Sequence, residues 1–238
     1  MDELPQYKRI VLKLSGEALK GNIPFGISNE TINSIADQIK KIHSLGVEIA
    51  IVTGGGNFFR GVKGNNLDIG RTSADYMGML ATIINGIALQ DILESKGLVT
   101  RLISALEIKS IAEPFIGRRI TRHLEKKRVV IFSAGTGSPY FSTDTAAALR
   151  AIEIRADILL KATLVDGVFS ADPKENKNAV KFKKISYSDV LSKELKVLDS
   201  TAVSLCKEND LKIKIFNISG KDNIFRSVIE KDIGTLIS

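Results

Sequence analysis

Short apolar runs rich in valine and isoleucine recur along the chain, and each is followed by glycine and then by a helical pattern. Runs of this length and composition are typical of strands buried on both faces of a parallel sheet. The sequence therefore predicts an α/β fold class. The predicted strands are residues 9–14, 47–52, 99–103, 128–132, 158–160 and 213–216.

The helical patterns differ in how their apolar residues are spread. Residues 28–42 open on Ser28 as a predicted N-cap and carry isoleucines along one stripe, which indicates a helix lying on the sheet. Residues 72–96 are apolar almost all the way round, so we expect burial on several sides, in part by a second subunit; the alternative is burial within one chain. Further helices are predicted over residues 117–127, 143–154, 200–209 and 223–230.

Length and composition exclude several classes of protein. The 238 residues contain no long linker, so we expect a single domain over residues 1–238. A lone cysteine, Cys206, excludes a disulfide scaffold and a cysteine-based zinc site. The formal charge of +7 indicates anionic partners. Residues 1–9 are polar and residues 77–89 are too short an apolar stretch to cross a bilayer, so we expect a cytoplasmic protein without a membrane partner.

Small, flexible residues follow four of the predicted strands. These glycine- or threonine-containing turns are residues 13–17, 53–57, 133–138 and 161–167. The carboxyl ends of parallel strands form the ligand crevice of an open sheet, and glycine lets backbone N–H groups approach phosphate closely. The two commonest nucleotide fingerprints fail, because Asn22 replaces the lysine of a Walker loop and Phe59 replaces the third glycine of a dinucleotide loop. The sequence thus predicts a phosphate site of another kind.

Two lysines stand where predicted strands end, Lys13 after the first and Lys161 after the fifth. Two ammonium groups at one crevice would flank a phosphoryl group during its transfer, and Asp144 and Asp172 would supply carboxylates. The alternative is that the lysines are strand-end residues whose charges extend into water. His43 and His123 fall in helical segments and are expected at the surface.

Five sequence blocks resemble the bacterial uridylate (UMP) kinases, a branch of the amino acid kinase superfamily. The combination of the third and fourth blocks is specific to this branch. The blocks are residues 7–17 (YKRIVLKLSGE), 54–61 (GGGNFFRG), 75–82 (DYMGMLAT), 133–144 (SAGTGSPYFSTD) and 161–173 (KATLVDGVFSADP).

The resemblance implies a three-layer α/β/α sandwich around a mainly parallel sheet. It implies an enzyme that transfers the γ-phosphoryl of ATP to UMP, giving UDP and ADP in pyrimidine nucleotide biosynthesis, with Mg²⁺ accompanying ATP. Residues 1–155 would bind the acceptor and residues 156–238 would bind ATP. The family further implies a homohexamer that responds to GTP and UTP.

The resemblance also assigns residues to roles. Lys13 and Lys161 would stabilise the moving phosphoryl and Asp144 would organise them. The expected ATP contacts are Lys13, Leu14, Ser15, Gly16, Gly56, Arg60, Thr163, Phe169 and Asp172. The expected UMP contacts are Gly55, Asp75, Thr136, Gly137, Ser138, Pro139, Tyr140, Phe141, Ser142 and Thr143. For Asp75 the alternative is a helix cap.

Three other functions compete with this assignment. A kinase of the same fold that phosphorylates a carboxylate or carbamate would share the ATP half and the lysine pair. A nucleic-acid-binding protein would explain the positive charge, but no helix-turn-helix, RNA-recognition or zinc signature is found. An NAD-dependent enzyme is disfavoured by the broken glycine fingerprints.

Overall fold

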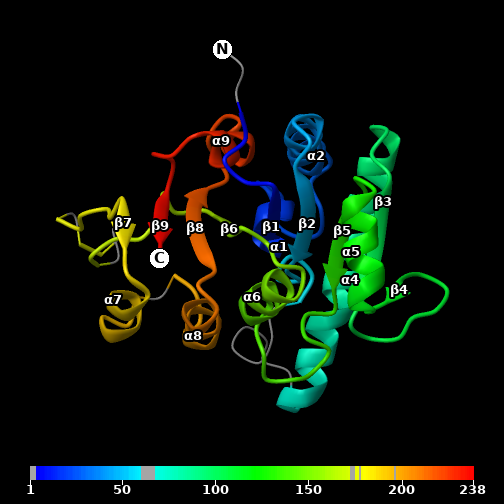
Figure 1. Cartoon of the computed structure of the whole chain (residues 1–238). Helices are drawn as coiled ribbons and strands as arrows, with labels where there is room; N and C mark the ends of the chain where they lie inside the picture. Colours follow the sequence, from blue (N-terminus) through cyan, green and yellow to red (C-terminus); the bar gives the residue numbers. More distant parts are fainter. Residues whose placement is uncertain (1–3, 60–67, 172–174, 177, 196) are drawn as a thin grey trace.

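The strands form one sheet that runs through the whole molecule (Figure 1). The structure is a computed structural model that describes residues 4–59, 68–171, 175–176, 178–195 and 197–238. Within these residues the strand order is β4-β3-β5-β2-β1-β6-β8-β9-β7. The strands are β1 Arg9–Leu14, β2 Glu48–Thr53, β3 Thr100–Ser104, β4 Glu113–Pro114, β5 Val129–Ser133, β6 Ile158–Thr163, β7 Lys184–Ile185, β8 Lys212–Asn217 and β9 Thr235–Ile237.

Neighbouring strands are parallel except for β8 and β9, which run antiparallel. The predicted α/β class and mainly parallel sheet are therefore confirmed. The sheet is divided in the same way as the chain. The strands before residue 155 make one half of the sheet and the strands after residue 156 make the other half. The two halves meet where β1 pairs with β6.

Helices cover both faces of the sheet, and side-chain alternation along the strands assigns residues to each face. On β1, Val11 packs in the core beneath α5, α6 and α8, while Leu12 packs in the core beneath α2, α4 and α9. The predicted three layers are confirmed. The helices are α1 Gly16–Lys20, α2 Asn29–Ser44, α4 Arg71–Ser95, α5 Gly117–Glu125, α6 Thr143–Glu153, α7 Tyr187–Ser192, α8 Ser200–Glu208 and α9 Asn223–Ile229.

The two helices singled out in the sequence differ in how much of their surface the chain covers. Ser28 caps α2 as predicted, its Oγ accepting from Thr31 N at 3.3 Å. On α4 the inner side is buried, including Met79, Ile83, Leu89 and Leu93. The outer side keeps between 38% and 49% of each large apolar side chain exposed, at Tyr76, Met77, Leu80, Ile84 and Ile87. Burial of α4 within one chain is thus incomplete.

By length and composition alone α4 is also apolar enough to cross a membrane, with a mean hydropathy of 1.3 over its most apolar window. It packs along β2, β3 and β5 in this fold. A helix that fills a core acquires the same apolar composition, so hydropathy does not separate the two cases.

Candidate active site

Lys13 and Lys161 come together at the carboxyl ends of β1 and β6, where they are register partners. Asp144, in the first turn of α6, lies between them. Its Oδ1 is 2.6 Å from Lys13 Nζ and its Oδ2 is 2.5 Å from Lys161 Nζ. Lys161 Nζ also donates to Val197 O at 2.6 Å. The three residues therefore form one connected ionic cluster.

The cluster is nearly buried, with exposed side-chain fractions of 8% for Lys13 and 14% for each of the other two. Burial alone would raise the pKa of Asp144, but the two adjacent ammonium groups outweigh it and hold that pKa below its ordinary value. Burial lowers the pKa of Lys161, and the Asp144 carboxylate opposes this shift. In direct contact two cations face one anion, and the Asp199 carboxylate adds only a weaker attraction to Lys161, so the ammonium groups outnumber their contacting carboxylate, which favours an anionic ligand.

Asp199 supports the cluster from the other half of the chain, and the sequence analysis missed it. It is the N-cap of α8, accepting from Ala202 N at 2.8 Å. It also accepts from Thr145 Oγ1 at 2.8 Å and from Ser142 Oγ, and Ser142 in turn caps α6. One carboxylate thus ties together the first turns of α6 and α8, and α6 carries Asp144.

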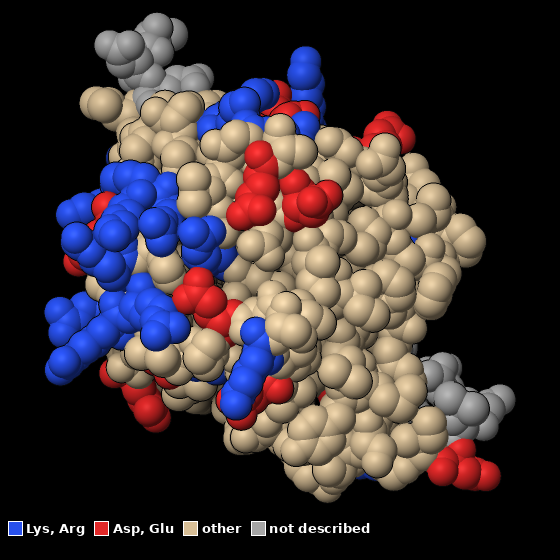
Figure 2. Space-filling view, turned by 90° about the vertical axis from the view of Figure 1, so that its right-hand side faces the viewer, with Lys and Arg blue, Asp and Glu red and all other residues tan. Residues whose placement is uncertain are grey.

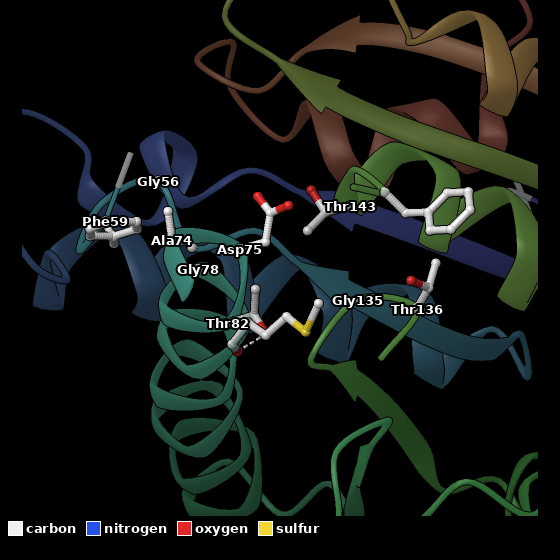
Figure 3. Close-up of a pocket in the computed structure, with 12 residues that line it drawn as sticks. Gly56, Phe59, Ala74, Asp75, Gly78, Thr82, Gly135, Thr136 and Thr143 are labelled. Carbon is white, nitrogen blue, oxygen red and sulfur yellow. Dashed lines mark hydrogen bonds between the residues drawn. The ribbon is translucent and has the colours of Figure 1, made fainter. Parts of the chain in front are cut away.

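A cavity of about 140 Å³ lies on the acceptor side, between the glycine turn after β2, the start of α4 and the loop after β5 (Figure 3). Asp75 and Thr143 point toward this space. Asp75 Oδ2 accepts from Tyr140 N at 2.8 Å and from Arg71 Nε at 2.9 Å. The lining residues are Gly55, Gly56, Phe59, Ala74, Asp75, Gly78, Met79, Thr82, Gly135, Thr136, Phe141 and Thr143.

The alternative that Asp75 caps a helix is wrong. Helix α4 begins at Arg71 and its N-cap is Gly70, so Asp75 lies beyond the first turn. Its carboxylate joins α4 to the loop after β5 instead.

A second cavity, of about 530 Å³, is lined entirely by residues from Lys161 onward. Of the expected ATP contacts, Thr163 and Phe169 line it, and Gly56 lines the smaller cavity. Lys161 lines the larger cavity while it contacts Asp144, whose neighbour Thr143 lines the smaller one. The cluster therefore stands where the two cavities approach each other.

The remaining expected ATP contacts lie at or after the end of β1. Leu14 is fully buried, which leaves only its backbone for a ligand. Ser15 Oγ caps α1 by accepting from Ala18 N at 3.1 Å. Gly16 packs so tightly against the glycine turn that a Cβ there would lie 2.5 Å from Gly56 N. Arg60 and Asp172 lie outside the described residues.

Five expected UMP contacts are in the loop after β5 but do not line the small cavity: Gly137, Ser138, Pro139, Tyr140 and Ser142. Ser138 N donates to Oγ1 of Thr136, which does line the cavity, at 3.2 Å, and this bond shapes the turn. Tyr140 is 67% exposed, and Arg71 lies over its ring at 5.4 Å. The hydroxyl of Ser142 is used as the α6 cap. Gly137 and Pro139 complete the loop, with Gly137 at a φ of 83°.

The prediction for His123 is wrong. It is 8% exposed, with Nε2 at 3.2 Å from Glu113 Oε2 and Nδ1 at 3.1 Å from an Arg128 nitrogen. His123 can lie on the buried side of α5 because Glu113 of β4 and Arg128, just before β5, provide hydrogen-bond partners for both ring nitrogens. His43 is half-buried, with Nε2 at 2.7 Å from Lys127 O.

Comparisons with known proteins agree with this geometry. A sequence model of the amino acid kinase family matches residues 8–217. The crystal structure of UMP kinase from Bacillus anthracis is 38% identical, with a TM-score of 0.94 over 98% of this chain and 96% of that one. UMP kinase from Ureaplasma parvum is 41% identical, with a TM-score of 0.93 over 98% and 99%. Uridylate kinase from Archaeoglobus fulgidus is 29% identical, with a TM-score of 0.75 over 96% and 99%.

Proposed function

The chain belongs to the amino acid kinase family and has the activity of a UMP kinase, and we propose that Lys13, Asp144 and Lys161 carry out its phosphoryl transfer. ATP is the phosphoryl donor, and the products are UDP and ADP. The observation that carries the proposal is the buried ionic cluster with excess positive charge beside both cavities.

In the proposed mechanism an oxygen of the UMP α-phosphate attacks the γ-phosphorus of ATP, and the bond from that phosphorus to the β-bridging oxygen breaks as ADP leaves. The acceptor is already ionised, so no side chain has to remove a proton and no covalent enzyme intermediate is needed. The Lys13 and Lys161 ammonium groups face the charge that builds up on the equatorial oxygens. Asp144 holds both ammonium groups in place.

We assign the acceptor cavity to residues 1–155 and the larger, ATP cavity to residues 156–238, with the turns after β1 and β2 contacting ATP from the first part. The smaller cavity lies wholly in the first part and the larger wholly in the second, which matches the order of strands in the sheet. UMP contacts are assigned to Gly55, Asp75, Thr136, Gly137, Ser138, Pro139, Tyr140, Phe141, Ser142 and Thr143. ATP contacts are assigned to Lys13, Leu14, Ser15, Gly16, Gly56, Arg60, Thr163, Phe169 and Asp172.

The described residues offer no protein cage for Mg²⁺, so we propose that the ion would enter bound to the phosphates of ATP. Among the described residues no group of three or more His, Cys, Asp or Glu side chains could hold a metal, and both Asp144 oxygens already face lysines. Mg²⁺ commonly keeps several waters and binds through substrate phosphates and one or two carboxylates. We propose that it neutralises the β- and γ-phosphates when bound.

A product assay tests the acceptor. With ATP and Mg²⁺, we expect UDP from UMP, and little or no product from aspartate or acetylglutamate. CMP should be a poor substrate, because its amino group reverses the hydrogen-bonding pattern that a polar site matched to uracil would recognise. Preferential phosphorylation of either carboxylate would instead support the kinase of the same fold with another substrate.

We also propose a homo-oligomer built on α4, most simply a hexamer assembled from dimers. The apolar outer side of α4 lies on the face seen in Figure 2, which includes a broad area without charged side chains. A second copy related by a two-fold axis would cover it. Light scattering should give a multiple of the chain's 25.9 kDa, and Ile87→Asp should dissociate the dimer. A monomer mass for the unmodified chain would contradict this.

GTP and UTP are proposed as effectors, with activity assays in their presence as the test. A cytoplasmic location and a place in pyrimidine nucleotide biosynthesis fit an enzyme that consumes UMP and ATP. Both remain proposals.

A further inference from the structure

The inner side of α4 carries two buried polar residues, Thr82 and Asn85, that contact the loops lining the acceptor cavity. Thr82 is 2% exposed and Asn85 is fully buried. Polar groups in such positions are costly unless their hydrogen bonds are satisfied. Where those hydrogen bonds go therefore indicates what the residues do.

Thr82 holds the start of the loop after β5. Its Oγ1 accepts from Ala134 N at 2.7 Å and donates to Met79 O at 2.7 Å. Ala134 has a φ of 61°, a left-handed conformation that costs a residue with a Cβ of order 1 kcal/mol or more and persists only where surrounding contacts enforce it. Thr82 supplies one such contact immediately before Gly135, which lines the acceptor cavity.

Asn85 holds the glycine turn after β2. Its Nδ2 donates to Gly54 O at 2.7 Å and to Asn57 Oδ1 at 2.7 Å. Asn57 Nδ2 returns a bond to Asn85 Oδ1 at 2.8 Å and donates to Gly26 O at 2.9 Å. All four amide N–H groups of the pair are used and both amide oxygens accept. The network is therefore fully satisfied, which makes it rigid.

The glycine turn also rests directly on α4. A Cβ at Gly55 would lie 2.7 Å from Gly78 O and 2.8 Å from the Ala81 Cβ. The contact between Gly55 and α4 thus sets the distance of the turn from the helix, and the bond from Asn85 to Gly54 O sets its position along the helix. Gly55 and Gly56 then form one wall of the small cavity, and Gly135 and Thr136 form another (Figure 3).

We propose that Thr82 and Asn85 are positioning residues for the acceptor: spaced three residues apart on one helix, they set the two loops of the UMP cavity at a fixed separation. This inference rests on the proposed function. Thr82 lines the small cavity, but its one hydroxyl proton is already donated to Met79 O, so it cannot donate to the nucleotide, and we assign its role to holding Ala134. Asn85 acts through Gly54 and Asn57 in the same way.

The proposal predicts a selective kinetic defect. Thr82→Val keeps the shape of the side chain and removes the hydroxyl, so the Ala134 N–H loses its partner and the loop can relax from its strained conformation. We expect the KM and the dissociation constant for UMP to rise about tenfold, the cost typical of one unpaired buried group. The KM for ATP should change less than about twofold. Thr82→Ser keeps the hydroxyl, so its affinity for UMP should stay close to that of the wild type.

Thr100→Val is the matched control. Thr100 is also a fully buried threonine, and its Oγ1 donates to Leu98 O at 2.9 Å at the start of β3, away from both cavities. It should lose a comparable amount of stability with unchanged affinity for UMP. Asn85→Leu should raise the KM for UMP by more than Thr82→Val, because it removes the donor to Gly54 O and both bonds between Asn85 and the Asn57 amide, which keeps only its bond to Gly26 O.

Titration calorimetry with UMP, together with steady-state kinetics, separates the outcomes. A wild-type protein that does not bind UMP would overturn the proposed function. A wild-type protein that binds UMP, with Thr82→Val indistinguishable from Thr100→Val, would overturn only the positioning role. If Thr82→Val does not fold, Thr82→Ala makes the same test with a residue that suits a helix better. For Thr82→Val, which acts on the loop after β5 alone, equal increases in the KM values for UMP and ATP would also contradict the proposal.

Discussion

Lys161 and Lys214 are buried lysines on the neighbouring strands β6 and β8, and burial lowers the pKa of both. Lys161 stands at the carboxyl end of its strand, contacts Asp144 and lines the larger cavity. Lys214 lies on the opposite face, where its Nζ donates to Ser227 O and Glu230 O, each at 2.9 Å. It thereby satisfies carbonyls at the end of α9.

Burial and a lowered pKa therefore do not by themselves identify a catalytic lysine. Lys161 differs in having a carboxylate partner, a second lysine in register and an open cavity beside it. Lys214 has helix carbonyls as hydrogen-bond acceptors and lines neither of the two cavities described above. The difference predicts that changes at Lys161 affect turnover, whereas changes at Lys214 affect stability.

The largest expected effect is on catalysis. Lys161→Ala and Lys13→Ala should each lower kcat about a hundredfold or more, because each removes a charge that faces the transferring phosphoryl, typically worth about 3 kcal/mol. Circular dichroism should show that both variants remain folded. Turnover close to wild type in either variant would mean that this lysine, like Lys214, has a structural and not a catalytic role.

The next largest effect is on stability. Lys214→Ala leaves two carbonyls near the end of α9 without their donor and opens a cavity, which should lower the free energy of unfolding by about 2 kcal/mol. Its kcat at a temperature where the variant is folded should stay within about twofold of wild type. Urea denaturation and the product assay measure the two quantities. A large loss of turnover in folded Lys214→Ala would contradict the comparison.

The sequence pointed to Lys13 and Lys161, because each ends an apolar run beside a flexible turn, but it gave no role to Lys214, which lies inside one. It also predicted the longer strands and helices, whose apolar periodicity persists over several residues. The strands β4, β7 and β9, of two or three residues, and the helices α1 and α7, of five and six residues, were missed. Segments this short contain too few residues to show a period, and tertiary contacts decide their conformation.

The parts of the site that escaped prediction depend on partners far away in the sequence. Asp199 precedes a helical pattern and could be read as an N-cap, but its bonds to Ser142 and Thr145 could not. Thr82 and Asn85 look like polar interruptions of an apolar helix until the strands bring the glycine turns against them. Charge and periodicity describe an element, whereas these contacts arise only when the sheet assembles.

A smaller loss of turnover is expected when Asp199, which ties the first turn of α6 to that of α8, is changed. Asp199→Asn keeps the size of the side chain but leaves one acceptor oxygen for three donors, which should loosen the first turn of α6 and shift Asp144. We expect kcat to fall about tenfold, equivalent to about 1.4 kcal/mol. Asp157→Asn is the control, because its Oδ2 accepts from two backbone N–H groups at the opposite end of the sheet. If Asp199→Asn and Asp157→Asn have the same kcat, Asp199 does not position Asp144.

The smallest effect is the pH dependence of stability that arises from Lys214. Burial lowers the pKa of Lys214 to about 8, although Glu230 and Asp232 oppose the shift, while in the unfolded chain the ordinary value is 10.5. Between these values the unfolded chain binds more protons than the folded protein, so the contribution of this group to stability rises with pH. Below about pH 8 both states are charged and the cost of burying the charge is present in full.

Wild type should therefore gain stability over Lys214→Ala as the pH increases. From about pH 7.5 to about pH 9 the difference between their free energies of unfolding should widen by about 1 kcal/mol. Groups common to both proteins, such as Tyr187 with a pKa raised by burial to about 12, cancel in this difference. Both hydrogen bonds survive deprotonation, because a neutral amine still has two N–H groups for Ser227 O and Glu230 O. Denaturation curves of the two proteins at both pH values measure the effect, and a difference that stays constant between them would mean that Lys214 remains charged in the folded state.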